Sequence, residues 1–131
     1  MNKHCERRLL TTTVALVCLV PLGAGIAGVV LGPAALEADV VSDPELDSHF
    51  RYLSGLLVGI GIAFAACIPA IERRSELFAV LTLVVVIGGL SRLGALVVND
   101  MPATPHIFAL VMELAIVPLL YLWQKEFASR P

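Results

Sequence analysis

Two charged side chains inside long apolar runs have the clearest chemistry in this sequence. Arg92 is the only charged residue within residues 77–99, and Glu113 is the only one within residues 101–124. A charge that faces lipid from such a run costs about 2.5 to more than 10 kcal/mol. A guanidinium and a carboxylate can instead neutralise each other through two parallel hydrogen bonds. Both side chains are therefore expected to have polar partners.

The positions of these two charges predict that they meet. Arg92 lies six residues before the end of its apolar run at Val98, and Glu113 lies six residues after the next run begins at Ile107. At a rise of 1.5 Å per residue, both lie about 9 Å from the same end of two consecutive antiparallel helices. This equal depth predicts a direct Arg92–Glu113 ion pair.

Further polar residues are expected at the same end of the helices. His106 precedes Glu113 by seven residues, which places both on one helix face. Arg51 begins the preceding apolar run at this end. Two arginines against one carboxylate leave one positive charge, which an anionic ligand, a phospholipid head group or Asp100 would neutralise. We therefore predict a ligand-binding group made of Arg51, Arg92, Glu113, Asp100, His106, His49 and Tyr52.

Four apolar stretches must position these residues. The chain has 131 residues, of which 58% are hydrophobic and 15% charged, and its mean hydropathy of +0.89 excludes an ordinary soluble domain. A membrane-spanning helix needs about 20 apolar residues. The sequence predicts an all-α, integral membrane four-helix bundle in one domain over residues 1–131, with spans at 9–31, 50–71, 77–98 and 107–124. The first span is longer than the apolar part of a signal peptide, so we expect it to be retained.

The basic residues predict the orientation. Lysine and arginine are concentrated before the first span, between the second and third spans, and after the fourth, at Lys3, Arg7, Arg8, Arg73, Arg74, Lys125 and Arg130. Under the positive-inside rule, both termini are cytoplasmic in a multi-pass protein of the bacterial cytoplasmic (inner) membrane. The net charge of −2 and this distribution argue against a nucleic-acid partner.

Small residues are expected to hold the helices together, because lipid gives helices no hydrophobic reason to associate. Three of the four spans contain glycines at close spacing, and Pro21, Pro69 and Pro118 are expected to kink their helices. The predicted packing positions are Gly28, Gly32, Gly55, Gly59, Gly61, Gly88 and Gly89.

The sequence contains no motif of a familiar soluble enzyme. Cys5, Cys18 and Cys67 lack metal-ligand spacing, and there is no phosphate-binding glycine loop, zinc-protease motif or nucleophile elbow. We assign no catalytic residue, no metal and no cofactor, and we favour a protein that is not an enzyme.

Short motifs resemble those of a bacterial four-span membrane family known only as domain of unknown function four-three-four-five. Phe50–Gly61 resembles its R-x-x-x-G-x-x-x-G-x-G signature, Leu90–Gly94 its third-helix arginine, Asn99–Pro102 the loop that follows, and Glu113–Leu114 its fourth-helix E-L. The resemblance covers about residues 9–125. It implies the four-span architecture and highlights Arg51, Arg92, Asp100 and Glu113, but implies no reaction. The chain departs from the family pattern at Ser54 and Met101. A second resemblance is to DoxX-like four-span proteins.

Three functions remain open. The favoured one is binding of a lipid or hydrophobic anion in an outer-leaflet polar pocket. The first alternative is a structural or accessory subunit whose Arg/Glu pair only fixes helix register. The second is a small membrane enzyme or proton-coupled carrier that uses Glu113. The expected partners are membrane lipids, with a homo-oligomer or a partner membrane protein as further alternatives.

Overall fold

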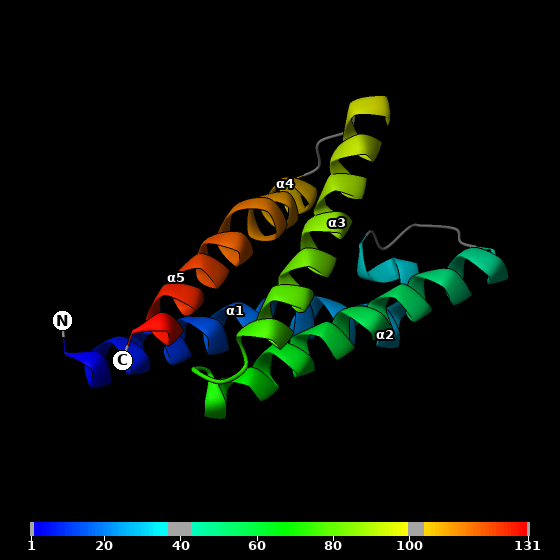
Figure 1. Cartoon of the computed structure of the whole chain (residues 1–131). Coiled ribbons are helices and arrows are strands. Elements are labelled where there is room, and N and C mark those ends of the chain that lie inside the picture. Colours follow the sequence, from blue (N-terminus) through cyan, green and yellow to red (C-terminus); the bar gives the residue numbers. More distant parts are fainter. Residues whose placement is uncertain (1, 37–42, 100–103, 131) are drawn as a thin grey trace. The chain divides into compact units, whose positions relative to one another are not determined.

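The computed structural model describes residues 2–36, 43–99 and 104–130, and all the regular structure in these residues is helical (Figure 1). Three long helices are followed by a fourth that consists of two α-helical parts around a π-helical segment. The elements are α1 (Lys3–Leu31), the 3-10 segment η1 (Gly32–Ala35), α2 (Pro44–Cys67), the 3-10 segment η2 (Ile68–Ala70), α3 (Ser75–Asn99), α4 (Thr104–Val111), the π-helical η3 (Met112–Ile116) and α5 (Val117–Ser129).

Among the described residues, four helical segments are long and apolar enough to cross a membrane. They are Lys3–Ala35, Pro44–Ala70, Ser75–Asn99 and Thr104–Ser129. The predicted all-α class is confirmed, as is the presence of four helices with the length and composition of membrane spans. The helices extend beyond most of the predicted boundaries because their polar ends stay helical. The cytoplasmic location of both termini stays a prediction.

The ends of α2 follow from local sequence. The side chain of Asp43 accepts a hydrogen bond from the backbone N–H of Leu46 at 2.7 Å, and Pro44 occupies the first helical turn. Both are favourable at a helix start. At the other end, α2 stops at Cys67 and Pro69 lies in η2. The expected kink at Pro69 is therefore wrong, because this proline follows the end of the helix, where its missing N–H breaks no α-helical hydrogen bond.

The chain forms two compact units. The first combines Met1–Leu10 with Pro69–Pro131, and the second is Thr11–Ile68. Helix α1 thus begins in the first unit and continues into the second. The single membrane domain over residues 1–131 stays a prediction.

In the second unit, glycines allow α1 and α2 to approach closely. A Cβ atom on Gly25 would lie 2.8 Å from the carbonyl oxygen of Ser54, and one on Gly61 would lie 2.8 Å from the Leu22 side chain. A Cβ on Gly28 would overlap the Ser54 hydroxyl. No side chain fits at these three positions unless neighbouring atoms shift, which agrees with the packing role predicted for Gly28 and Gly61. Gly25 was not predicted.

Gly32 is required for a second reason. Its φ angle is +63°, which lies in the left-handed region that residues with a Cβ rarely adopt. This conformation ends α1 and directs the chain into η1. A Cβ there would also meet the side chains of Asp47 and Arg51.

The predicted packing glycines do not all lie in tight contacts. A Cβ on Gly89 would lie 2.9 Å from the Cβ of Glu113, so this glycine does let two helices approach. Within the described part of the chain, a Cβ on Gly55, Gly59 or Gly88 would have no heavy atom within 4 Å. A packing role for these three stays a prediction.

In the first unit, α3 packs along the last helix, with the two running antiparallel. Gln124 is fully buried in this contact. Its Nε2 donates to the carbonyl oxygen of Ile71 at 2.6 Å and to the hydroxyl of Ser75 at 2.8 Å. These bonds join α5 to the beginning of α3, which places Arg92 of α3 at the level of η3.

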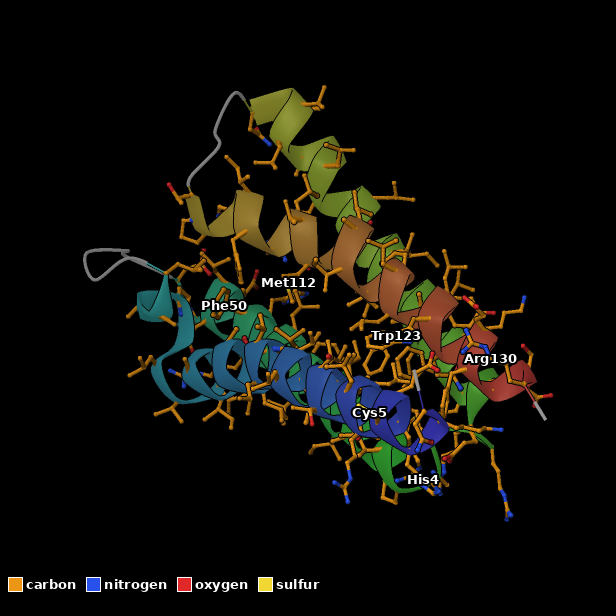
Figure 2. All side chains as sticks on the ribbon, turned by 90° about the vertical axis from the view of Figure 1, so that its left-hand side faces the viewer. His4, Cys5, Phe50, Met112, Trp123 and Arg130 are labelled. Atoms are coloured by element: carbon orange, nitrogen blue, oxygen red, sulfur yellow. The ribbon has the colours of Figure 1, made fainter. Side chains whose placement is uncertain are left out.

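The first turns of α1 are tied to the C-terminal end of the chain. The carboxylate of Glu6, which is 5% exposed, accepts from Nε1 of Trp123 at 3.3 Å and from Nη1 of Arg130 at 2.8 Å. Figure 2 labels Trp123 on α5 and Arg130 just after it. Arg7 forms an ion pair with Glu72 beside this cluster. One end of the first unit is therefore held together by ion pairs as well as by apolar contacts.

Candidate functional site

The predicted Arg92–Glu113 pair is present. Nε of Arg92 donates to Oε2 of Glu113 and Nη2 donates to Oε1, both at 3.0 Å. This is the forked geometry in which a guanidinium and a carboxylate match best. The pair joins the C-terminal third of α3 to η3, and the two opposite charges neutralise each other.

His106 of α4 is the third member of this cluster. Nη1 of Arg92 lies 3.2 Å from Nδ1 of His106. A guanidinium has only N–H donors, so Nδ1 must be the acceptor and the proton of a neutral imidazole must be on Nε2. The seven-residue spacing from Glu113 thus brings His106 to the site, as predicted. Arg92, Glu113 and His106 form what we call the Arg92 site.

The backbone around Glu113 departs from an α-helix. The N–H of Val117 donates to the carbonyl oxygen of Met112, five residues earlier, as in a π-turn. Pro118 follows and has no N–H to donate, so the α-helical pattern is interrupted here. Short π-helical segments are frequent at functional sites. In the sequence, Pro118 indicates that the helix is irregular near Glu113. A proline does not predict whether the irregularity is a kink, a break or a π-turn.

Gly89 opposite this segment explains how close the two helices come. A side chain at position 89 would collide with Glu113 and Leu114. Without one, η3 packs directly on α3, and the guanidinium three residues further along α3 reaches the Glu113 carboxylate. The packing role predicted for Gly89 is therefore present, and it lies beside the ion pair.

The Arg92 site retains hydrogen-bonding capacity. The three contacts of Arg92 use three of the five N–H groups of a guanidinium, which leaves two without a partner among the described residues. The side chain of Arg92 is 34% exposed and that of Glu113 is 19% exposed. The site can therefore offer N–H donors to a further oxygen acceptor.

Arg51 has partners of its own in the second unit. Its Nε donates to Oδ2 of Asp47 at 2.8 Å, and its Nη1 donates to the carbonyl oxygens of Val29 at 2.6 Å and Val30 at 3.0 Å. These carbonyls belong to the last turn of α1, where backbone acceptors lack intrahelical partners and a cation is favourable. Arg51 thus caps α1.

The prediction of one surplus positive charge from Arg51 and Arg92 against Glu113 is wrong, because Asp47 neutralises Arg51. This carboxylate lies four residues before Arg51 on α2, a spacing that brings two side chains together on a helix. The i, i+4 spacing was visible in the sequence. A contact of Arg51 with Arg92 and Glu113 stays a prediction.

The other predicted site residues have less defined roles. His49 and Tyr52 lie on α2 and are exposed. Asp100 lies outside the described residues. Their membership of a ligand-binding group stays a prediction.

The described residues contain no group of three histidine, cysteine or acidic side chains that could hold a metal ion.

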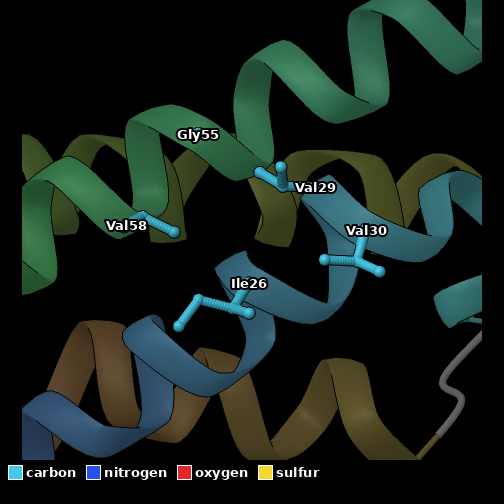
Figure 3. A pocket seen from close by; sticks show the side chains of 5 residues that line it. All are labelled: Ile26, Val29, Val30, Gly55 and Val58. Atoms are coloured by element: carbon cyan, nitrogen blue, oxygen red, sulfur yellow. The ribbon is translucent and has the colours of Figure 1, made fainter.

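The second unit contains an open apolar groove that the sequence did not predict. It has a volume of about 230 Å³ and is lined by Ile26, Val29, Val30, Gly55 and Val58 (Figure 3). The missing side chain of Gly55 leaves room between α1 and α2. The groove lacks charged residues in its lining, so it matches a hydrocarbon chain in chemistry but has no specificity for a head group.

Together these features define a class of protein: an all-helical chain with four helices that can span a membrane and an arginine–glutamate pair within the spans. A family model described as "Domain of unknown function (DUF4345)" matches residues 9–124. The chain therefore belongs to this family, as its motifs predicted. No curated protein and no solved structure matches the chain.

Proposed function

We propose that this protein binds a lipid or another amphipathic molecule through the Arg92 site, inside the bacterial cytoplasmic membrane. One observation carries the proposal: two N–H groups of an intramembrane guanidinium have no partner among the described residues. An unsatisfied polar group in hydrocarbon costs several kcal/mol. A ligand oxygen would satisfy it.

The chemistry of the site indicates the kind of ligand. The ion pair is neutral as a whole, so the site attracts its ligand through N–H donors more than through net charge. With Nδ1 accepting from Arg92, Nε2–H of His106 is a third N–H donor of the site, after the two N–H groups of Arg92. Phosphate, carboxylate and ester oxygens all accept such bonds. Because the basic residues lie at the opposite end of the helices, the positive-inside rule puts this site in the outer leaflet.

A structural role is the second candidate, and the forked geometry favours it. Two parallel hydrogen bonds between Arg92 and Glu113 allow only one register of α3 against η3. The pairing of Arg51 with Asp47 also removes one reason to expect an anion. In this case the protein would be an accessory subunit whose charges only orient its helices.

Native mass spectrometry with co-purified lipids separates the two candidates. A double variant, Arg92→Leu with Glu113→Leu, removes both charges and avoids an unpaired one. His106→Leu removes only the third member, and Ser91→Ala is a control because Ser91 bonds the backbone of its own helix. Lipid binding predicts loss of a specific adduct in the double variant and weaker retention in His106→Leu. Unchanged adducts together with altered stability would instead establish the structural role.

A further inference from the structure

The Arg92 site is electrically neutral as a whole. The guanidinium of Arg92 carries one positive charge and the carboxylate of Glu113 carries one negative charge, and the two are paired at 3.0 Å. His106 adds no charge in this arrangement, because its Nδ1 accepts from Arg92 only when the ring is unprotonated. No other charged residue occurs within the described ranges 77–99 and 104–124 of the first unit. An anion bound here would therefore bring a negative charge that no described group balances.

The membrane makes such a charge unfavourable. An uncompensated charge inside the hydrocarbon is costly, whereas a ligand without net charge avoids this cost and still accepts hydrogen bonds. Asp100 lies outside the described residues, but it is acidic, so its charge would disfavour an anion further. The charges of the site therefore favour an uncharged oxygen acceptor.

The depth of the site favours a carbonyl oxygen over a phosphate oxygen. Arg92 lies six residues before the end of its apolar run at Val98, which is about 9 Å at 1.5 Å per residue. A lone arginine would extend from this depth towards the head groups, but two hydrogen bonds to Glu113 hold this guanidinium beside η3. Lipid phosphates belong to the interfacial layer outside the hydrocarbon. An acceptor that reaches the site therefore lies deeper than a phosphate.

The apolar surroundings require a ligand that carries hydrocarbon. Leu90 and Leu93 on α3 are exposed, as are Ile107 and Val111 on α4. These side chains lie within spans, where exposed apolar surface contacts lipid chains. A ligand that enters the site from this side comes from the membrane and needs a chain that mixes with lipid.

We propose that the Arg92 site selects an uncharged lipid, bound through a carbonyl oxygen, over an anionic one. This inference rests on the proposed function, because it specifies the ligand of the same site. The donors are the two N–H groups of Arg92 that have no partner among the described residues, together with Nε2–H of His106. A carbonyl oxygen has two lone pairs and accepts two of these bonds. Glyceride esters and quinones both supply such a carbonyl.

Two ligands with the same hydrocarbon chain test this selection. Methyl oleate has an uncharged ester, and oleate has a carboxylate that is ionised at pH 9. Carbon-13 NMR of each ligand, labelled at its carbonyl carbon, measures binding to the full-length protein in non-ionic detergent at pH 9. We expect the parent to bind methyl oleate at least about tenfold more tightly than oleate. Competition by dioleoylglycerol or by a ubiquinone then distinguishes an ester from a quinone as the source of the carbonyl.

Glu113→Gln changes the charge of the site without removing its oxygen acceptor for Arg92. The site then has a net positive charge, so the preference should reverse and oleate should bind more tightly than methyl oleate. Ser91→Ala is the matched control, because this hydroxyl bonds the backbone of its own helix, and it should keep the preference of the parent. Thermal unfolding checks the folding of each variant. If Glu113→Gln does not fold, His106→Leu replaces it, since it removes one donor but no charge and should weaken methyl oleate.

The double variant Arg92→Leu with Glu113→Leu separates failure of this inference from failure of the proposed function. Methyl oleate should lose its specific binding in this variant. Oleate that binds the parent as tightly as methyl oleate or more tightly, but not the double variant, would overturn the selection and leave a lipid-binding site. Equal binding of both ligands to the parent and to the double variant would refute the proposed function and this inference with it.

Discussion

Glu113 on η3 receives two parallel hydrogen bonds of 3.0 Å from the guanidinium of Arg92 on α3. The two residues are 21 positions apart and come from different helices, but each is the only charge in its apolar run, residues 77–98 and 107–124. Neither group is stable in lipid without the other. The pair therefore couples the folding of α3 to that of the irregular turn around Glu113.

This coupling predicts an asymmetric response to substitution. Arg92→Leu or Glu113→Leu alone leaves the other charge without its partner and should lower the free energy of unfolding by about 3 kcal/mol or more. The double variant should lose less than either single variant. Reversible unfolding in mixed micelles measures all three. Additive losses in the double variant would show that the two residues do not stabilise each other.

Two adjacent glycines allow a test of helix packing at the same place. Gly89→Ala puts a Cβ 2.9 Å from the Cβ of Glu113 and should destabilise the protein by about 1 to 3 kcal/mol. Gly88→Ala is the control, since its Cβ has no described heavy atom within 4 Å. It should be neutral or stabilising by up to about 1 kcal/mol, because alanine favours helix. Thermal unfolding of the two variants distinguishes a contact with η3 from a general effect of glycine.

The cap on α1 predicts a structural role for Arg51. Arg51→Gln shortens the side chain and leaves Asp47 and the carbonyls of Val29 and Val30 without their charged donor. We expect this variant to be less stable than the parent. Hydrogen exchange should increase in the last turn of α1 and remain unchanged at Arg92. Protection of this turn equal to that of the parent would contradict the cap.

The ion pair of Glu72 with Arg7 predicts sensitivity to acid. Burial alone would raise the pKa of Glu72, but hydrogen bonds from the backbone and from Arg7, together with the charges of Arg7 and Arg73, lower this pKa below its ordinary value of 4.5. A carboxylate with a lowered pKa in the folded state stabilises the protein above the unfolded-state pKa. This contribution should disappear as the pH falls below about 4.5 and through the lower folded-state pKa.

Unfolding measured as a function of pH checks this expectation. The parent should be more stable than Glu72→Gln near neutral pH, and the difference should shrink in acid. Arg7→Gln should reduce the acid dependence in the same direction, because it removes the donor that holds the carboxylate ionised. A constant difference between the parent and Glu72→Gln at every pH would argue against the ion pair as the source.

Several features of this protein follow from sequence because they depend only on helix geometry. A fixed rise per residue sets the depth of Arg92 and Glu113, and a fixed number of residues per turn puts His106 on the face of Glu113. Both relationships are present in the structure. The four spans likewise follow from the length of apolar runs, since lipid requires a closed set of backbone hydrogen bonds.

Other features depend on how distant segments pack, and the sequence did not reveal them. Arg51 is charged and helical by sequence, but its carbonyl partners on α1 exist only once α1 and α2 pack together. Glu6 finds Trp123 and Arg130 more than 100 residues away. Among the glycines, spacing alone did not separate Gly89, which is packed against η3, from Gly88, which is not.

The π-turn around Glu113 shows most clearly what tertiary structure decided. Pro118 predicts that the helix is irregular, but an α-helix with a proline can bend, break or widen. Packing against Gly89 and the hydrogen bonds from Arg92 accompany the widened turn here. Sequence by itself determined which residues lie at each depth of each span. Tertiary structure decided which of them meet, because lateral contacts between helices depend on the shapes of both surfaces and not on the spacing within either one.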